Sequence, residues 1–580
     1  MDETSLAAAI PARPMSRFRV EARTWLICLA MASPAAIPYA THYLMAPKGC
    51  IPTGFIAYDM PYYFANGREH FDDGKFRWTY GNPSDVTYDT ARIYVQPLSL
   101  LLGAVWRATG WPPGAIFAGF GLIAAVACVR VALGLYRHLV GLSGPAHWLG
   151  MVLFLWGGGL LAVMGIAVSF WKLPPFLFSF GNKFLLDPGC VFVFDPSGGW
   201  WFLNLGRNLI FPTEALYHAV FLGAILCVLR ERFRAAAALV ALMGVSHPFT
   251  GIELMGVLGP WAALEVYFVG NRRVPKWFPY AILGMAGAHL GYYLGYLNEF
   301  AGHRSLSAQW TQDWGIDALH FVPAYALVGG FAAWGVRRLP MAKAAFDQPR
   351  NRLFLVWFLA VFAMANHEFA VRPPVQPIHF TRGYDWMPLF LLGLPTLVAT
   401  LSALLKSPGR PARVALAALI VATFLTDNAL WFAYMPINAA FKKVNADIYI
   451  SKDDREVMDA MQRIGGPRGL VATQNHGINY LSSVYTPLRS WSGHIANTPN
   501  RAQRQNDLDQ LFFTGRFLPE WENETLLVAI YNTPENVQYQ GRWLQARHAS
   551  KVLENPSYAL YKVAPSRTAS SSKSGGATRR

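Results

Sequence analysis

The sequence predicts a polytopic α-helical membrane protein with about eleven transmembrane helices and a small C-terminal α/β domain outside the membrane. The first observation is composition: 53% of the 580 residues are hydrophobic and only 14% are charged, which is far more apolar than a soluble protein of this length. The second is a series of apolar runs separated by short basic segments. The third is a change after Met435 to the composition of an ordinary soluble domain.

Eleven apolar runs are interpreted as membrane-spanning helices, because about 20 apolar residues cross the hydrocarbon core of a bilayer. The run at 255–269 is short, so a tilted helix or a re-entrant pair is an alternative there. No cleavable signal peptide is expected, because the first run is long enough to span and lacks a small-residue cleavage site. The predicted spans are 24–45, 114–135, 147–171, 213–229, 235–254, 255–269, 276–297, 319–336, 353–370, 386–405 and 414–435.

The Lys and Arg residues predict the orientation of these helices. The net charge of +16 is divided into short clusters between apolar runs, a pattern typical of the positive-inside rule rather than of nucleic-acid binding. These clusters fall at alternate turns, so we expect a cell inner-membrane protein with a cytoplasmic N-terminus. The clusters lie near residues 13–23, 137, 230–234, 272–276, 337–352 and 406–413.

The apolar run YVQPLSLLLGAVWRATG, at 94–110, does not fit this alternation, because a crossing there would invert every later helix. We expect instead an amphipathic helix that lies in the membrane interface. Pro97 and the segment Trp111-Pro112-Pro113 bound it.

The chain is predicted to have three parts. Residues 1–435 form the transmembrane module, whose first outer loop, at 46–113, contains interfacial helices. Residues 436–565 form a soluble periplasmic α/β domain: SKDDREVMDAMQRI has an N-cap serine and helical spacing, and GLVATQ, LLVAIYN and SYALYKV have the composition of strands. The low-complexity tail at 566–580 is expected to be disordered. No cytoplasmic segment is large enough to form a nucleotide-binding domain.

The stretch YDMPYYFANGREHFDDG, at 58–74, places acids and tyrosines directly behind the first span. Asp59 precedes a helix-like run in this stretch. One interpretation is that Asp59 only caps the N-terminus of that helix. The other is that Asp59 is a catalytic carboxylate.

The same stretch resembles the first outer loop of GT-C membrane glycosyltransferases, the class that includes aminoarabinose transferases and protein O-mannosyltransferases. The resemblance rests on Asp59, Tyr62, Tyr63, Ala65 and Gly74, and on DTARIYVQPLSLLLGAVWRATG with Asp89, Arg92 and Pro97. The tandem Asp-Glu of several family members is missing, so the loop offers no support for a metal role. The resemblance implies a GT-C-like fold and a sugar donor carried on polyprenyl phosphate.

The chemistry implied by this resemblance needs a base and a phosphate-binding group. An ionised carboxylate can take the proton of an acceptor hydroxyl, and Asp59 is the candidate base. The polyprenyl phosphate leaves readily, so one carboxylate suffices, unlike the paired acids of glycosidases. Arg382 and His379, in PIHFTRGYDW, are the candidate phosphate partners, with Arg92 a weaker one. Alternatively, Arg382 reaches lipid headgroups or pairs with Asp385.

A third group of ionisable residues is predicted in the outer half of the membrane. TEALYHAV places Glu214 and His218 one turn apart on one helix face. SHPFTGIE places His247 on the next helix, roughly 18 Å along its axis from Ala235 and towards the outer face. Two histidines and a carboxylate suit zinc or a similar ion, so these three are candidate ligands of a divalent metal cofactor. The alternatives are hydrogen bonds to one another and to a substrate headgroup, or a structural role between helices.

These features predict a membrane glycosyltransferase, a hexosyl- or pentosyltransferase, that moves a sugar from a polyprenyl-phosphate donor to a lipid, glycan or protein acceptor. It would act in the lipid bilayer, on the outer face of the cytoplasmic membrane, with no nucleic-acid partner. A lipid or sugar transporter or flippase is one alternative, and a non-catalytic envelope assembly protein is another. The predicted substrate-binding residues are Tyr62, Tyr63, Asp89, Arg92, Glu214, His218, His247, His379 and Arg382.

Overall fold

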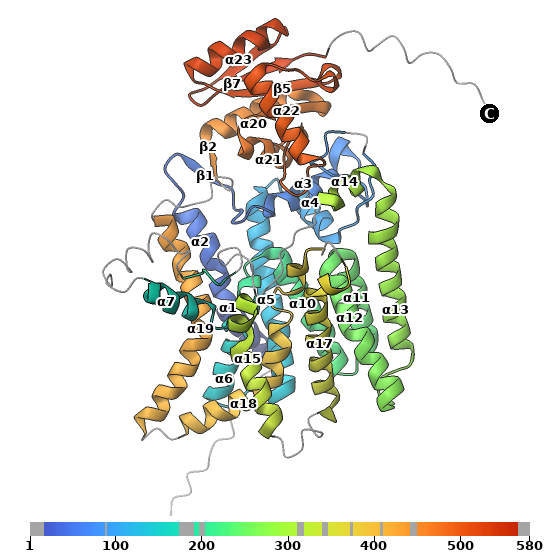
Figure 1. The fold of residues 1–580 in the computed structure, drawn as a ribbon, viewed down its shortest axis with the longest axis vertical. Coiled ribbons are helices and arrows are strands. Elements are labelled where there is room, and N and C mark those ends of the chain that lie inside the picture. The colour runs from blue at the N-terminus through green and yellow to red at the C-terminus, as the bar shows by residue number, and fades with distance from the viewer. Residues whose placement is uncertain are drawn as a thin grey trace, which may run out of the picture.

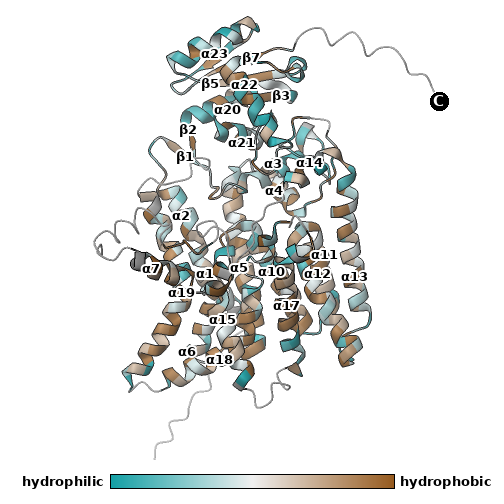
Figure 2. Ribbon diagram, in the orientation of Figure 1, coloured by the Kyte–Doolittle hydropathy of each residue, from teal (hydrophilic) through white to brown (hydrophobic). Residues whose placement is uncertain are grey.

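Apolar helices fill one end of the molecule, and a mixed β-sheet with its covering helices occupies the other (Figure 1). Hydrophobic residues dominate the long helices, whereas hydrophilic residues gather around the sheet and on the segments beneath it (Figure 2). The structure is a computed structural model. It describes residues 17–87, 90–172, 191–195, 203–309, 318–338, 346–371, 375–406, 410–440 and 449–565.

Seven helical stretches among the described residues are long and apolar enough to cross a membrane. An eighth crossing forms if α6 (Pro145–Trp156) and α7 (Leu161–Lys172), bent by 73° at their junction, count as one span. The chain is therefore a multi-pass membrane protein. The seven stretches are Glu21–Leu44 (in α1, η1 and α2), Pro113–Val140 (α5), Pro212–Leu229 (α10), Pro248–Val269 (α12 and η5), Leu319–Arg337 (in α15), Trp386–Leu405 (α18) and Pro411–Ile437 (in α19).

The predicted number of eleven spans is not confirmed. Three of the predicted runs correspond to helices outside the set of candidate spans: α11 (Phe233–Ser246), α13 (Trp277–Leu290) and α17 (Pro349–Ala365). A helix of 14 residues is about 21 Å long, which is less than the hydrocarbon core of a typical bilayer. Apolar composition alone therefore does not fix the number of crossings.

The predicted division between spans 235–254 and 255–269 is wrong. α11 ends at Ser246, His247 is extended (φ −150°, ψ 127°), and one continuous helical stretch then runs from Pro248 to Val269. Pro248 causes this break because proline has no amide hydrogen and disfavours helical geometry in the residue before it. His247 consequently caps α12 instead of lying within the ascending helix.

A layer between the long helices and the sheet contains α3 (Met60–Glu69), α4 (Pro97–Thr109) and α14 (Ala301–Gln309) (Figure 1). α4 lies where an interfacial helix was predicted, and its 13 residues give a length of about 20 Å, too short to cross a bilayer. α3 and α4 pack closely because Gly67 faces Gly103: a Cβ on either glycine would meet backbone atoms of the other.

The C-terminal segment contains a five-stranded sheet in the order β4-β3-β5-β7-β6. β3 pairs in parallel with β4 and β5, and β7 pairs antiparallel with β5 and β6. The three predicted strands correspond to β3, β5 and β7, and the predicted helix to α20, which begins with a capping box between Ser451 and Asp454. The elements are α20 (Lys452–Gly465), β3 (Gly469–Thr473), α21 (His476–Tyr485), β4 (Arg489–Ser490), α22 (Arg501–Thr514), β5 (Thr525–Tyr531), α23 (Pro534–Ala546), β6 (Ser550–Glu554) and β7 (Tyr558–Val563).

The link between the helices and the sheet is itself a small sheet. β1 (Cys50–Pro52), which follows the first span, pairs antiparallel with β2 (Tyr449–Ser451), which precedes α20. The last helix, α19 (Pro411–Ala440), runs a few residues past the predicted boundary at 435. The first outer loop and the C-terminal segment are thus bound together directly.

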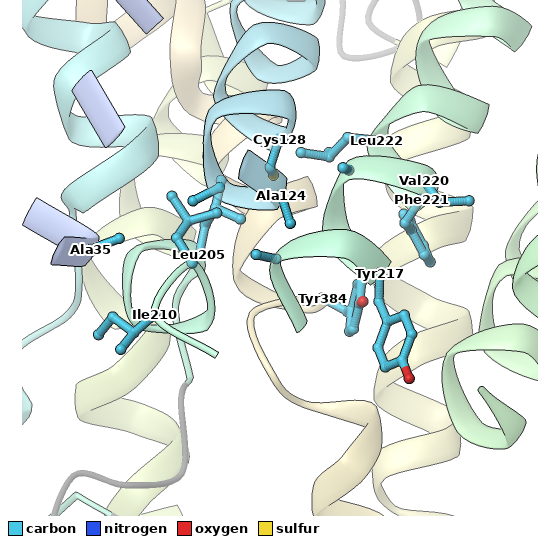
Figure 3. Close-up of a cluster of buried hydrophobic side chains, with 14 of the residues drawn as sticks. Ala35, Ala124, Cys128, Leu205, Ile210, Tyr217, Val220, Phe221, Leu222 and Tyr384 are labelled. Atoms are coloured by element: carbon cyan, nitrogen blue, oxygen red, sulfur yellow. The ribbon is translucent and has the colours of Figure 1, made fainter. Parts of the chain in front are cut away.

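Small and aromatic side chains form the core between α5 and α10 (Figure 3). Ala124 and Cys128 of α5 lie beside Leu222 of α10, and all three are buried. Phe221 packs against Tyr384 with ring centroids 4.7 Å apart. Small residues let the helices approach closely, which provides packing energy where lipid removes the hydrophobic driving force. The packing of α10 against α5 therefore fixes the position of the first turn of α10.

A buried polar network, not expected from the sequence, fastens α19 to its neighbours. Asp427 is fully buried and accepts hydrogen bonds from the amides of Gly159 (2.7 Å) and Ala162 (2.8 Å) at the bend between α6 and α7. Arg207, also buried, pairs with Asp195 and donates to the backbone oxygen of Asp427 at 3.0 Å. Ionised groups within the membrane are costly unless paired, and this network pairs them.

We expect Asp427→Asn to destabilise the protein. The asparagine keeps one acceptor but points an NH₂ group at one of two backbone N–H groups, so a buried donor loses its partner at a cost of about 1–3 kcal/mol. Thermal unfolding in detergent would measure the loss. Thr426→Ala is the control, because the Thr426 hydroxyl donates an exposed hydrogen bond within its own helix, to the Ala422 oxygen; equal melting temperatures for the two variants would contradict the assigned role.

Candidate active site

Asp59 does not cap the helix that follows it. It lies directly before α3, but its backbone is already helical (φ −77°, ψ −12°) and its side chain makes no capping hydrogen bond. Instead the carboxylate is 67% exposed, and its Oδ1 lies 3.2 Å from Nε2 of His494, whose own side chain is 3% exposed. The interpretation of Asp59 as a simple cap is therefore wrong.

The surroundings of Asp59 favour its ionised form. Partial loss of hydration among the surrounding protein atoms raises the pKa of Asp59, but the hydrogen bond and electrostatic interaction with His494, together with the charge of Arg382, outweigh this and hold the pKa below its ordinary value. The contact with His494 has the length of a hydrogen bond but not an ideal alignment, as is common in unliganded sites. A carboxylate that remains ionised at neutral pH can accept a proton.

Aromatic side chains surround the ring of His494. Its centroid lies 5.1 Å from that of Tyr58, 5.0 Å from Tyr62 and 5.2 Å from Tyr480. Tyr480, on α21, also donates a 2.5 Å hydrogen bond to the backbone oxygen of Tyr58 and accepts one from the amide of Tyr62. Residues of the first loop and of the C-terminal segment thus build this part of the site together.

Ion pairs reinforce the same junction. Arg489 of β4 is 5% exposed and donates a 2.8 Å hydrogen bond to Oε1 of Glu69, at the end of α3. Arg92 donates to the backbone oxygen of Glu69 at 2.7 Å. The structure therefore places Arg92, a weaker candidate for phosphate binding, in a contact that supports α3. Asp89 lies outside the described residues.

Arg382 and Glu214 form a buried ion pair. Glu214 lies in the first turn of α10 and is 2% exposed; Arg382 follows η9 (Pro377–Phe380) and is 19% exposed. The alternative pairing of Arg382 with Asp385 is not observed. Backbone contacts hold the segment in place, because the Arg382 carbonyl accepts hydrogen bonds from Asn208 (2.8 Å) and His218 (2.9 Å). A guanidinium fixed in this way matches a phosphate group well.

The predicted histidines gather around this ion pair. His218 stacks on Tyr384 with ring centroids 4.4 Å apart, and His247 stacks on Tyr217 at 4.6 Å. The ring centroid of His379 lies 6.1 Å from that of His247. Burial, with the charges of Arg382 and His247, holds the pKa of His379 well below its ordinary value. His379 is therefore neutral at physiological pH, and the cationic role predicted for the pair falls to Arg382.

The arrangement does not fit the predicted metal site. Nδ1 of His218 lies 2.8 Å from the Glu214 carbonyl oxygen and Nε2 lies 2.9 Å from that of Arg382, so both ring nitrogens already face acceptors. Glu214 is committed to Arg382, and Nδ1 of His247 accepts the amide of Thr250 at 3.2 Å. Within the part of the chain that the structure describes, no group of three or more His, Cys, Asp or Glu is placed to hold a metal ion.

Tyr63 connects the two halves of the site. It lies on α3, one turn after Asp59; burial raises its pKa to about 12, Glu214 and Asp59 add to this effect, and Thr213 and Arg382 oppose it. Its phenol is therefore a neutral hydrogen-bonding group that is close enough to Asp59, Glu214 and Arg382 to respond to their charges.

A cavity of about 730 Å³ begins at Tyr62 and Tyr63. This volume suits a ligand of drug-like size or larger. Its walls come from α3, α12, α14, α17 and the segments following α13, and most of them are aromatic or apolar. Polar groups occur at a few points, namely Asn66, Gln96, Ser246, His289, His303, Ser307, His367 and Asn497.

The sequence did not identify His494 and Tyr480, the residues by which the C-terminal segment contributes to this site. His494 lies in the loop SGHIANTPN, which follows β4, a strand of two residues and too short to be recognised from its pattern. One signal could have indicated His494: it follows a parallel strand, and ligands of α/β sheets bind beyond the carboxyl ends of the strands. Tyr480, on α21, has no distinguishing pattern around it.

The fold and the site define a multi-pass membrane protein with a polar site, built around one carboxylate, between its helices and its sheet. No family model matches the sequence, and comparison with curated proteins finds no match. Several solved structures are similar at low identity.

One is the crystal structure of ArnT from Cupriavidus metallidurans bound to undecaprenyl phosphate, with 12% identity and a TM-score of 0.45, covering 95% of this chain and 99% of that chain. A second is the archaeal oligosaccharyltransferase AglB from Archaeoglobus fulgidus, in complex with an inhibitory peptide and a dolichol-phosphate, with 13% identity and a TM-score of 0.39, covering 89% of this chain and 70% of that chain. A third is the Archaeoglobus fulgidus oligosaccharyltransferase complex with Zn and sulfate, at 12% identity and a TM-score of 0.39, covering 88% of this chain and 68% of that chain.

ArnT and AglB are thus among the structures to which this chain is similar. Likenesses this distant do not establish an activity. The function of this chain has to be argued from its own residues.

Proposed function

We propose that the protein is a membrane glycosyltransferase that moves a sugar from a polyprenyl-phosphate donor to a hydroxyl group of a lipid, glycan or protein acceptor. The observation that carries this proposal is the Asp59 carboxylate. It leaves its helix uncapped, is exposed to solvent, contacts His494 and has a pKa held below its ordinary value. An ionised carboxylate that is open to an incoming hydroxyl group can take its proton as the new bond to the sugar forms.

The reaction is a single displacement. The acceptor oxygen attacks the anomeric carbon of the sugar, and its proton passes to the Asp59 carboxylate. The bond between the anomeric carbon and the phosphate oxygen breaks, and its electron pair leaves with the polyprenyl phosphate. Asp59 then releases the proton to water. One displacement inverts the configuration at the anomeric carbon.

Arg382 is the group proposed to bind the donor phosphate. Its guanidinium is partly exposed, its backbone is held by Asn208 and His218, and its charge acts on Asp59. Charge-assisted hydrogen bonds to a phosphate gain strength as negative charge develops on the leaving group. Glu214 orients the guanidinium. No step in this scheme passes through a metal.

The cavity that begins at Tyr62 and Tyr63 supports a substrate with a large apolar part. Its aromatic and apolar lining would remove a lipid chain from water, and the scattered polar groups would orient a head group. A polyprenyl chain has these properties. The sugar is a hexosyl or pentosyl group, and the assay below identifies it together with the acceptor.

The experiment that tests the function uses the purified full-length protein in lipid nanodiscs and a polyprenyl phosphate carrying a radiolabelled sugar. Release of free polyprenyl phosphate, with label appearing in an added envelope-lipid or glycan acceptor, is the expected result. Movement of the labelled lipid across vesicle bilayers without its cleavage would identify a flippase. Neither cleavage nor movement with any acceptor fraction would favour a non-catalytic role.

We further propose that the site faces outward from the inner membrane. The helical stretch from Pro248 to Val269 begins at the cavity, and its 22 residues give a length of about 33 Å, so the basic loop around Arg272 lies at the opposite end. Trp78, in the first loop, is 73% exposed on the side of the site.

In a cysteine-free background, a membrane-impermeant maleimide applied to intact spheroplasts should label Trp78→Cys. The matched variant Arg272→Cys should react only after permeabilisation, because basic loops remain cytoplasmic. The reverse pattern would place Asp59 in the cytosol and remove the basis for chemistry on the outer face.

A further inference from the structure

His494 is buried at the edge of the site and belongs to the C-terminal segment, not to the transmembrane helices. It follows β4 in the loop that reaches down to Asp59, more than four hundred residues away in the chain. This loop is fastened to the first outer loop at several points. The amide of Ile495 donates to the Tyr58 hydroxyl at 3.0 Å, and Asn82 donates to the backbone oxygen of Asn497 at 2.8 Å.

The hydrogen bonds of His494 determine which ring nitrogen carries the hydrogen. Nδ1 accepts from the backbone amides of Ala496 (3.0 Å) and Asn497 (3.2 Å). Backbone amides can only donate, so Nδ1 bears no hydrogen and the hydrogen of the neutral ring is on Nε2. Nε2 is the atom that lies 3.2 Å from Oδ1 of Asp59. The turn therefore presents an N–H group to the carboxylate.

The rings around His494 restrict its movement. Tyr58, Tyr62 and Tyr480 pack on it with centroids 5.0–5.2 Å away, and the side chain is 3% exposed whereas that of Asp59 is 67% exposed. One carboxylate oxygen thus lies 3.2 Å from a rigidly placed donor while most of the group remains open. A base held in this way keeps a defined direction towards an incoming hydroxyl.

We infer that His494 is a positioning residue for the base Asp59, so that the C-terminal segment completes the active site of the transmembrane module. This inference rests on the proposed function. The arrangement is the same in principle as a carboxylate that orients a catalytic histidine, with the two roles exchanged.

Two nearly isosteric substitutions separate the two functions of the ring. His494→Asn keeps an acceptor close to the position of Nδ1, so the turn at 494–497 is retained, but it loses the donor to Asp59. His494→Gln keeps an N–H donor close to the position of Nε2 but loses the acceptor of the turn. If His494 positions Asp59, His494→Asn should lower turnover more than His494→Gln. If His494 only supports the turn, His494→Gln should lower turnover more.

We expect His494→Asn to lower kcat by about 10- to 100-fold through loss of orientation, with little change in the KM for the donor. His494→Gln should recover most of that loss. His548→Asn is the control, because His548 is exposed in the same segment with φ 55°, a conformation that asparagine tolerates. Unaltered kcat in His494→Asn, or greater damage in His494→Gln, would overturn the inference.

The pH dependence gives a second measurement. Loss of His494 removes the hydrogen bond and the electrostatic interaction that lower the pKa of Asp59, so the acidic limb of kcat/KM should move to higher pH in His494→Asn. The other charged group that acts on Asp59 is Arg382, and the phenols around the site are those of Tyr58, Tyr62, Tyr63 and Tyr480. An acidic limb at the same pH as in the wild type would contradict the inference.

A measurement without turnover separates this inference from the proposed function. Carbodiimide modifies protonated carboxyl groups, and mass spectrometry of Asp59-containing peptides gives the pH midpoint of labelling. If the wild type transfers no sugar but His494→Asn still moves this midpoint upwards, the positioning contact holds and the proposed function fails. If the wild type is active and the midpoint does not move, the inference fails and the proposed function remains.

Discussion

Asp59→Asn is expected to lower kcat by about 10²- to 10⁴-fold, the range by which a positioned general base accelerates proton transfer. The substitution preserves shape and removes only the group that accepts the proton. Binding of the donor should change little, because the phosphate is assigned to Arg382. The measurement is release of polyprenyl phosphate from the labelled donor by the purified variant, with thermal unfolding to show that it is folded.

Asp509→Asn is the matched control. Asp509 is an exposed carboxylate on α22 that accepts a hydrogen bond from Gln505 at 3.2 Å. Asp509→Asn is therefore expected to turn over at the wild-type rate. If Asp59→Asn folds and turns over as fast as this control, then Asp59 is not the base.

The pH dependence follows from the same residue. A base acts in its ionised form, and the pKa of Asp59 is held below the ordinary value of 3.8. The part of kcat/KM that depends on Asp59 should therefore stay constant from neutral pH down to pH 3.8 and fall only at lower pH. A fall centred near neutral pH would indicate a different base.

Arg382→Gln is expected to have the second large effect, on both stability and turnover. The substitution leaves the Glu214 carboxylate, 2% exposed, without its partner. Breaking a buried ion pair by removal of one member costs about 3–5 kcal/mol. Loss of the phosphate donor should in addition lower turnover by about 10²- to 10³-fold, as removal of a transition-state hydrogen-bond donor does elsewhere.

The double variant Arg382→Gln with Glu214→Gln separates the two effects. It removes both charges and keeps their approximate shapes, so much of the stability should return. Turnover should remain low, because no cation faces the phosphate. A double variant that is stable and fully active would exclude Arg382 as the phosphate partner and leave the ion pair with a structural role only.

The membrane class and several elements could be predicted from the sequence because they depend on local composition. Long apolar runs predict α5, α10, α18 and α19, since a helix that crosses lipid has to be apolar along its length. The strands β3, β5 and β7 follow from β-branched and aromatic runs bounded by turns. The number of crossings could not be predicted in this way, because α11 is as apolar as a span and is shorter.

The candidate residues were predicted one by one, but their pairing was not. Asp59, Glu214 and Arg382 each stand out as ionisable groups next to apolar helices. Nothing near them in the sequence indicates that Glu214 pairs with Arg382 and not with a metal. Pro248 indicates an interruption of the helix. That His247 caps α12 becomes clear only from the structure of α12 itself.

The sequence by itself determined that this chain lies in a membrane and that an α/β segment follows its last long apolar run, and it singled out the Asp59 carboxylate as a candidate base. Only the tertiary structure decided what that carboxylate contacts. Local patterns specify helices and strands through backbone and hydration energies. The approach of His494 to Asp59 depends on how β1 pairs with β2 and how α3 packs against α21, and such long-range packing leaves no periodic signature in the chain.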